Sequence, residues 1–303
     1  MAMEWWLREF RENVTQKIRT LLWRQWGALG VSSFVESESK WLIDPEALYV
    51  ATSTLGKLDK RLREVVEVWN SMYSKYLSKP RYKRIWKFYN EITDTLRFKE
   101  SSTRLNDFKE TTYAYRTRRT KEILSFLQIK NPALLRLRLR SLFGQNARAE
   151  VFLYFLYHDS GTSLSISREI FLDQKSVYSV LRGWLEAGIL ESAGGKKEGY
   201  LLSEQSRRDW MRALGISSLP RYLNWGKVMT VMAIIVEALE TAPWKDDTYL
   251  LSSLFRDVSP MLNDFWRATN ITPPEPSLYP GAAFASEFSK SFQNALQVLT
   301  GEK

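Results

Sequence analysis

The chain has 303 residues, with 44 lysines and arginines against 34 aspartates and glutamates, and a net charge of +10. This balance favours a polyanionic partner, and the absence of cysteine excludes disulfide and thiolate chemistry. The charge is uneven, because residues 1–150 sum to +12 whereas residues 151–200 and 201–303 each sum to −1. We predict a mainly α-helical, cytoplasmic protein that neither spans nor binds a membrane.

Residues 1–42 are predicted to form an amphipathic N-terminal helix. Its apolar residues recur at helical spacing from Trp5 to Trp26, and such a stripe needs a covering surface. Glutamates at positions 4, 9 and 12 argue against an anionic bilayer as that surface. We therefore expect the stripe to pack within the chain or to form a dimer.

Residues 43–130 are predicted to form a basic helical domain with three helices. Asp44 and Pro45 open the first helix, Asp59 opens the second, and residues 78–98 supply the third. This outline is that of a helix-turn-helix, but no strand hairpin follows it. A bracing or dimerisation domain is therefore the favoured interpretation.

The third helix of this domain is rich in cations and aromatic residues. Its cations could bind DNA that flanks a main site, or they could only make the surface of a packed helix soluble. Tyr82, Trp86 and Tyr89 could stack on bases, but aromatic residues at helical spacing more often belong to a core. The cations that we predict to contact DNA here are Lys79, Arg81, Lys83 and Arg84.

Residues 131–205 are predicted to form the next domain, which opens with alternating leucine and arginine. The alternation over residues 135–140 fits a half-buried strand, whereas Asn131 and Pro132 followed by spaced leucines fit the start of a helix. We favour the helix. Its arginines, which we expect to be solvated, are Arg136, Arg138 and Arg140.

Three helices and a hairpin are predicted to follow. The helices are expected at residues 147–157, 163–171 and 174–187, the third with Asp173 as its N-cap. Gly188 ends the third helix, and the apolar period then changes from about 3.6 to about 2. This change predicts two strands, at residues 189–193 and 200–203, around a glycine-rich tip with two lysines.

Residues 166–177 read ISREIFLDQKSV, and Leu181, Leu185, Gly188 and Leu190 follow. In this order they resemble the winged helix-turn-helix domain of prokaryotic transcriptional regulators grouped with the MarR and ArsR repressors. The resemblance covers about residues 142–203 of the 303. One position departs from the family pattern, because Phe171 stands where the turn glycine is usual. The turn is therefore expected either to open differently or to use a strained backbone.

The resemblance implies that the third helix enters the major groove of double-stranded DNA and that the hairpin tip lies against the neighbouring backbone or minor groove. Glutamine can pair with adenine, and lysine with guanine or phosphate. We expect a homodimeric regulator of transcription. The alternative is a non-catalytic interaction protein, such as an antitoxin or an assembly subunit. The residues assigned to DNA contact are Gln174, Lys175, Ser176, Tyr178, Arg182, Lys196, Lys197, Arg148 and Ser165.

Residues 206–303 are predicted to form a C-terminal helical domain for dimerisation or sensing. Its helices are expected at residues 225–239, 249–269 and 282–299. A sensing role would require a small-molecule effector, which the sequence does not identify.

Signals for catalysis are weak in this sequence. His158, the one histidine, falls in a helix break where a loop or capping role is sufficient, and the common nucleotide-binding and hydrolase motifs are absent. Residues 142–150 resemble the opening of small nucleotidyltransferases, but the required pair of aspartates does not follow. We therefore expect no enzyme activity, no cofactor and no metal, and we assign this segment to a helix entry at which Arg148 contacts phosphate.

Overall fold

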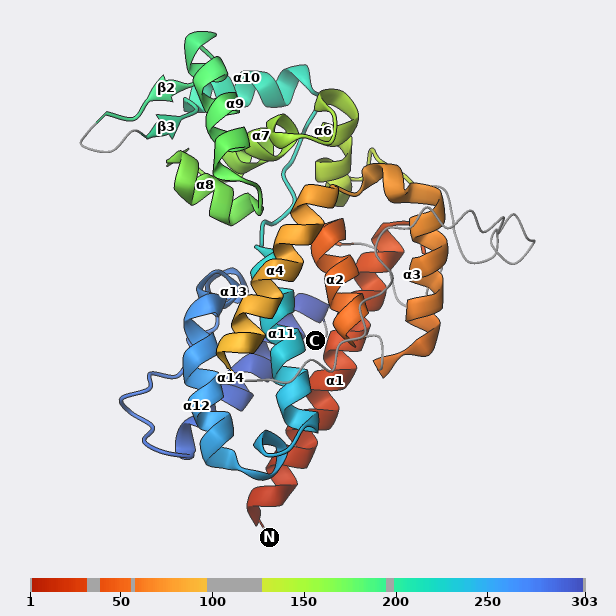
Figure 1. Ribbon diagram of the computed structural model, residues 1–303, viewed down its shortest axis with the longest axis vertical. Helices are drawn as coiled ribbons and strands as arrows, with labels where there is room; N and C mark the ends of the chain where they lie inside the picture. The colour runs from red at the N-terminus through yellow and green to blue at the C-terminus, as the bar shows by residue number, and fades with distance from the viewer. Residues whose placement is uncertain (1, 32–38, 56–57, 97–126, 195–198, 302–303) are drawn as a thin grey trace.

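The computed structural model describes residues 2–31, 39–55, 58–96, 127–194 and 199–301. Over these ranges the chain is mainly α-helical, with one small antiparallel sheet. Figure 1 shows a lower group of long helices and a smaller upper group that carries the sheet. We call the lower group the helical body and the upper group the upper unit.

The helical body contains helices from both halves of the chain. They are α1 (Ala2–Ala28), α2 (Pro45–Leu55), α3 (Lys60–Tyr73), α4 (Lys79–Thr95), α11 (Trp225–Glu240), α12 (Thr248–Val258), α13 (Asn263–Thr269) and α14 (Ala283–Thr300). The helices of the upper unit are α6 (Leu135–Phe143), α7 (Ala147–Tyr157), α8 (Ser163–Ile170), α9 (Gln174–Glu186) and α10 (Glu204–Ala213).

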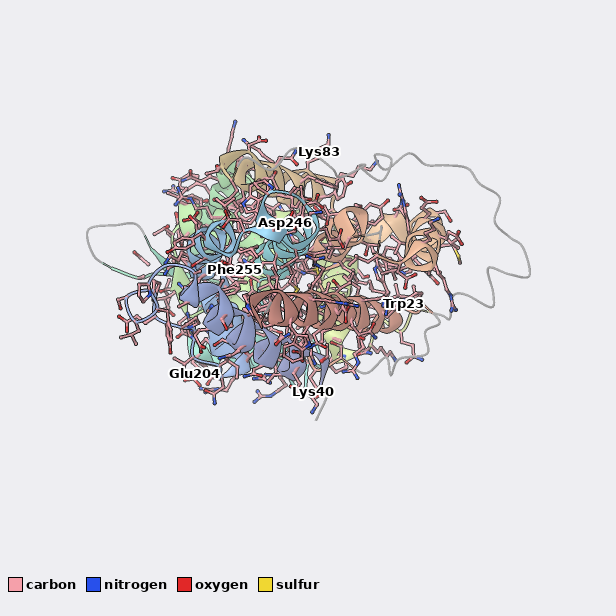
Figure 2. All side chains as sticks on the ribbon, turned by 90° about the horizontal axis from the view of Figure 1, so that it is seen from below. Trp23, Lys40, Lys83, Glu204, Asp246 and Phe255 are labelled. Atoms are coloured by element: carbon pink, nitrogen blue, oxygen red, sulfur yellow. The ribbon has the colours of Figure 1, made fainter. Side chains whose placement is uncertain are left out.

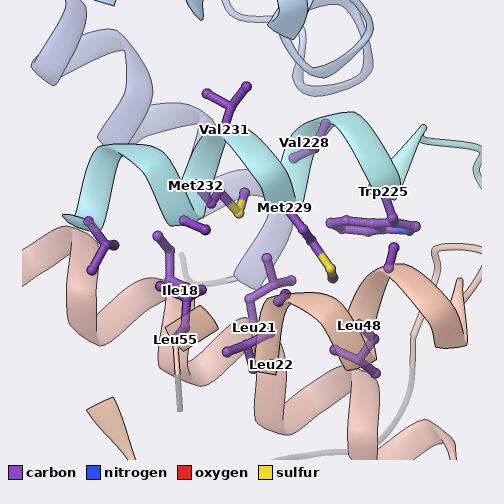
Figure 3. Packing of buried hydrophobic residues seen from close by; sticks show 14 of the residues in the cluster. Ile18, Leu21, Leu22, Leu48, Leu55, Trp225, Val228, Met229, Val231 and Met232 are labelled. Carbon is purple, nitrogen blue, oxygen red and sulfur yellow. The ribbon is translucent and has the colours of Figure 1, made fainter. Parts of the chain in front are cut away.

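One hydrophobic core runs through the helical body. Figure 3 shows α11 lying across α1 and α2, with Met229 and Met232 of α11 facing the side where Leu21 of α1 lies. The apolar stripe of α1 is buried against this core, and Val14 is fully covered. The chain itself therefore covers the stripe. Segments 1–42, 43–130 and 206–303 all contribute residues to the same core.

Three short strands form the sheet of the upper unit. β1 (Ser160–Gly161), β2 (Glu191–Ser192) and β3 (Tyr200–Leu201) pair antiparallel in the order β1-β3-β2. Tyr200 in the central strand lies opposite Gly161 on one side and Ser192 on the other. The sheet closes one end of a separate small core formed by α7, α8 and α9, in which Val151, Ile166 and Leu181 are fully buried.

Most predicted helices are confirmed. α7, α8 and α9 begin and end within one residue of the expected positions. The helix favoured after residue 131 is also confirmed, as a short 3-10 turn at Pro132–Leu134 that leads into α6. The expected single helix at 249–269 is divided into α12 and α13 by a 3-10 turn at Ser259–Leu262, because Pro260 lacks the amide hydrogen that a continuing helix needs.

Two elements were not predicted. β1 lies in the segment between α7 and α8, where only a loop is expected from the sequence. α10 lies in a segment for which the sequence predicts no helix. None of the residues of α10 is fully buried, and the helix packs through the partly buried Trp210 and Met211. Among the described helices, none combines the length and the apolar character needed to cross a bilayer.

Candidate nucleic-acid interface

Helix α9 is held on its inner side and presents its outer side to solvent. Asp173 caps its N-terminus as expected, and the Ser176 amide donates to the Asp173 carboxylate at 2.7 Å. Val177 and Leu181 are fully buried in the small core of the upper unit. Because these two residues are four apart, they fix one face of the helix and leave the opposite face free of packing.

The exposed face of α9 is mostly polar and contains all five of the residues predicted there. The Gln174 side-chain amide donates to the hydroxyl of Ser163 at 3.1 Å, so the first turn of α8 orients it. Arg182 pairs with Glu186 one turn later at 3.2 Å. The exposed residues of this face are Gln174, Lys175, Ser176, Tyr178, Ser179, Arg182, Gly183 and Glu186.

The turn between α8 and α9 uses a left-handed residue that is not glycine. Phe171 has φ 54° and ψ 49°, so the strained backbone, one of the two outcomes expected for this turn, is the one adopted. Its ring packs edge-to-face on Phe88 of α4, with the centroids 5.5 Å apart. On its other side the ring lies so close to Gly226 of α11 that a Cβ there would be 2.4 Å from Cε2. The turn is therefore anchored in the helical body.

Three arginines and three carboxylates form a buried ion cluster beneath this turn. None of the six side chains is more than 6% exposed, and the positive and negative charges are equal in number. The cluster joins helices of the body to helices of the upper unit. Its members are Asp44, Glu46, Arg81, Arg136, Arg140 and Glu150.

Arg81 occupies the centre of this cluster, and its assignment as a DNA contact is wrong. Its guanidinium binds the carboxylate of Asp44 through two hydrogen bonds, of 2.9 and 2.7 Å, and also binds Glu46. Its Nε donates to the carbonyl of Ile170, the last residue of α8, at 2.8 Å. At 1% exposure this side chain cannot reach a phosphate. It links α4 to α2 and to the end of α8.

Arg136 and Arg140 are also buried, which contradicts the expectation that the arginines of α6 are solvated. Arg140 binds Glu150 and Glu46, each at 2.6 Å, and Arg136 binds Glu150 at 2.9 Å. Burial alone would raise the pKa of Glu150, but the charges of Arg136, Arg140 and Arg81 outweigh it and lower the pKa to about 2. The cluster therefore stays ionised at neutral pH.

Arg138 is only half-buried, and its guanidinium caps the end of α10. It donates to the carbonyl of Leu214, and to that of Gly215 at 3.4 Å. These contacts satisfy carbonyl groups that a helix C-terminus leaves without an intrahelical partner. None of the three arginines of α6 is therefore a freely solvated cation of the kind that was expected.

The outer face of α4 keeps its cations in solvent. Lys79, Lys83, Arg84 and Lys87 are exposed. Arg84 follows Arg81, which binds the last residue of α8, by one helical turn. The pKa of Asp173, the N-cap of α9, is lowered by hydrogen bonds from Ser176 and, to a smaller extent, by the charge of Arg84. Tyr82, Trp86 and Tyr89 face inward and are buried in the core, so they are not available for base stacking.

The other predicted contacts have different environments. Arg148 is exposed in the first turn of α7, just after the cap residue Asn146. Ser165 is exposed, but its hydroxyl accepts from the amide of Thr162 at 2.9 Å in a capping box of α8, so its first role is structural. Lys196 and Lys197 lie outside the described residues.

Sequence reasoning missed a polar contact that fixes α8 to the helical body. The Glu169 carboxylate accepts from Lys227 at 2.8 Å and from the Tyr222 hydroxyl at 2.9 Å. Its backbone carbonyl accepts from the Asn224 side chain at 3.1 Å. No local pattern indicates these pairs, because the partners are more than 50 residues apart in sequence. His158, by contrast, is the C-cap of α7, one of the roles expected for it.

An open pocket of about 490 Å³ lies at the end of α10 and is lined by Arg208, Met211, Arg212 and Gly215 among others. Both arginines pair with acids of their own helix, at 2.8 and 3.2 Å. Within the part of the chain that the structure describes, no three His, Cys, Asp or Glu side chains are grouped as metal ligands.

Comparisons of the chain with protein-family models, with curated proteins and with solved structures give no match, so only the arrangement of its own residues supports an assignment of function.

Proposed function

We propose that the protein is a sequence-specific double-stranded-DNA-binding regulator of transcription, with α9 as its recognition helix. The observation that carries this proposal is the exposed polar face of α9, on a helix whose opposite face packs into the small core through the buried residues Val177 and Leu181. A helix about 10 Å across fits the major groove, where polar side chains can distinguish base pairs. The protein would act by binding and without a cofactor or catalytic step of its own.

The order of elements around α9 supports this proposal. α7, β1, α8, α9 and the β2–β3 pair follow one another along the chain, and β1 joins the sheet beside β3. This is the order that a winged helix of the prokaryotic regulator type would require. In that arrangement α8 and α7 brace the recognition helix, and the segment between β2 and β3 is the wing.

The side chains at the start of α9 suit contacts with base edges. Gln174 is held by Ser163 in a defined orientation, and a glutamine amide can pair with the N6 and N7 positions of adenine. Lys175 and Arg182 would contact guanine or phosphate. Tyr178 is 41% exposed and adds an apolar surface that suits a thymine methyl group. We propose these residues, together with Ser176, as the readers of the site.

A homodimer is part of the proposal. Regulators with one recognition helix per chain gain affinity and specificity by placing two such helices in successive major grooves, about 34 Å apart. A palindromic site with half-sites about 10 to 10.5 base pairs apart would be the corresponding DNA target.

Selection from a library of random duplexes tests the proposed function. The full chain is mixed with duplexes that contain a randomised central segment, and the bound fraction is amplified and sequenced over several rounds at about 0.1 M salt. We expect enrichment of one short motif, and a selected duplex that binds at least about 1,000-fold more tightly than a scrambled one. Failure to bind any duplex, even at low salt, would contradict the proposal.

The competing function is protein binding through the same surface. Leu164 of α8 and Tyr178 of α9 are 43% and 41% exposed, and they give this side of the upper unit an apolar component. Binding to duplexes without enrichment of any motif would leave the chain a non-specific DNA-binding protein. No binding at all would favour the protein-interaction alternative, such as an antitoxin or an assembly subunit.

A further inference from the structure

We infer that the outer face of α4 is a second DNA-binding surface, which takes the phosphates that flank the base pairs contacted by α9. This inference rests on the proposed function and adds to it a surface in the helical body. We call the surface the α4 basic face. Its residues are Lys79, Lys83, Arg84 and Lys87.

One side of α4 is turned towards the α8–α9 turn. Arg81 donates to the carbonyl of Ile170, and Phe88 packs on Phe171. Arg81 and Phe88 are seven residues apart, so they lie on the same face of the helix after two turns. This face fixes the rotation of α4 about its own axis.

The α4 basic face begins next to that contact. With 3.6 residues per turn, Arg84 lies at the border of the face that holds Arg81, and Lys87 and Lys83 follow outward around the helix. Figure 2 shows Lys83 at the outer margin of the molecule, away from the packed interior. Because Arg81 and Phe88 hold α4 against the α8–α9 turn, the basic face adjoins the start of α9. In agreement with this position, the charge of Arg84 adds to the hydrogen bonds from Ser176 that lower the pKa of Asp173, the N-cap of α9.

The position of this face relative to α9 is set by buried contacts and not by a flexible linker. The guanidinium of Arg81 is 1% exposed and is bound to two carboxylates, and the ring of Phe171 is wedged between α4 and α11. Close-packed contacts of this kind hold elements in one arrangement. A duplex that meets the first turn of α9 would thus meet the same α4 cations each time.

The segment that contains α9 has too little positive charge to bind phosphates strongly by itself. Residues 151–200, which contain α8, α9 and the hairpin, sum to −1, and a neutral or acidic surface gains little from counterion release. Lys79 to Lys87 span about 12 Å of helix, on the scale of neighbouring phosphates of one strand. The α4 basic face provides the cations that the segment with α9 lacks. A duplex suits it better than an acidic protein because the face is continuous with the proposed DNA-reading helix.

The salt dependence of DNA binding tests this inference. The test variant combines Lys83→Gln, Arg84→Gln and Lys87→Gln in the full chain, and the control variant combines Lys60→Gln, Arg267→Gln and Lys290→Gln. Both variants lose three exposed cations, and the control cations lie on α3, α13 and α14. The affinity of each protein for a random-sequence duplex of about 30 base pairs, and for the best selected duplex, is measured between about 50 and 300 mM salt.

We expect the test variant to lower the slope of log affinity against log salt by about 2 to 3, at about 0.9 per phosphate contact. The control variant should keep the slope of the parent within about 0.5. A second variant, Lys83→Gln with Lys87→Gln, leaves Arg84 beside Asp173 and should lower the slope by about 1 to 2. Because phosphate contacts carry little sequence information, the preference for the selected duplex should persist in all variants.

An unchanged slope in both test variants would overturn the inference, and so would an equal fall in the control. In those cases selective binding by the parent would still support the proposed function, with phosphate contacts elsewhere. A parent that binds no duplex would overturn both. If the test variants bound DNA as the parent does but bound an acidic protein partner more weakly, the face would be assigned to protein binding. That result would overturn the inference as well.

Discussion

Arg81 is the residue on which the junction between the helical body and the upper unit depends most. It binds Asp44 and Glu46 of the body and the carbonyl of Ile170 at the end of α8, all out of contact with water. A buried ion cluster adds little net stability over a well-packed apolar one, since each charge is costly to remove from water. Removing a single member of the cluster lowers the stability much more, because the remaining charges stay buried and uncompensated.

Arg81→Met is therefore expected to lower the free energy of unfolding by about 3 to 5 kcal/mol. Methionine keeps the unbranched apolar part of the side chain and removes the charge. The matched control is Lys83→Met, two residues away on the exposed side of α4, which should change the free energy by no more than about 0.5 kcal/mol. Urea unfolding followed by circular dichroism measures both. Equal effects of the two variants would show that Arg81 does not hold the junction.

Gly226 is the second residue on which the junction depends. A Cβ at this position would lie 2.4 Å from Cε2 of Phe171, and the ring cannot retreat because Phe88 packs on it as well. Gly226→Ala is expected to destabilise the protein by about 1 to 3 kcal/mol through overpacking.

Gly183→Ala is the control, because Gly183 lies inside α9 and a Cβ added there would have no neighbouring atom within 4 Å. Alanine favours the helix at this position, so the change should stabilise the protein by about 0.5 to 1 kcal/mol. Thermal or urea unfolding compares the two variants. A Gly226→Ala protein as stable as the parent would mean that Phe171 is not wedged against α11.

At the scale of elements, the buried ion cluster makes the association of α2, α4, α6 and α7 dependent on pH. The pKa of Glu150 is lowered from 4.5 to about 2 in the folded protein. The unfolded chain therefore binds more protons than the folded chain as the pH falls below about 4.5. Stability from this group is fully present above about pH 4.5 and is lost as the pH falls towards about 2.

We expect the free energy of unfolding to fall steadily as the pH is lowered from about 5 to 3, with little change between about pH 6 and 7. Asp44 acts in the same direction, since the charges of Arg136 and Arg81 outweigh its burial and hold its pKa well below the usual range. Urea titrations at successive pH values measure the effect. A free energy that stays constant over this acidic range would contradict ionised carboxylates in the cluster.

The elements around α9 could be predicted because their signals are local. Asp173 marks the start of α9, the spacing of Val177 and Leu181 marks its buried face, and Gly188, with φ 70°, marks its end. The partners of the arginines could not be predicted in this way. Arg140 and Glu46 are 94 residues apart, and an arginine that will be buried looks in sequence like one that will be solvated. Two-residue strands such as β1 are likewise fixed by their partner and not by their own composition.

Over the molecule as a whole, a single body built from both ends of the chain carries the upper unit. The larger core includes Phe171, which belongs to the upper unit by sequence, so the two groups of helices share packing at the α8–α9 turn. Figure 1 shows α4 and the segment leading into α11 on the side of the body that meets this turn. The orientation of α9 is therefore set by the body, and DNA binding by α9 would depend on the integrity of that junction.

Base reading by the first turn of α9 is the step on which the proposed function depends. Its most direct test compares the parent with Gln174→Ala combined with Lys175→Ala, on the selected duplex and on a scrambled duplex of equal length. The matched control is Gln205→Ala with Arg208→Ala, an exposed glutamine and an exposed cation on α10 of the same unit. Circular dichroism and unfolding curves verify that all three proteins are folded.

We expect the α9 variant to lose about 1 to 3 kcal/mol of discrimination for each base contact removed, while it still binds the scrambled duplex, and the α10 variant to discriminate as the parent does. An α9 variant that prefers the selected duplex as strongly as the parent would contradict the assignment of α9 as the recognition helix.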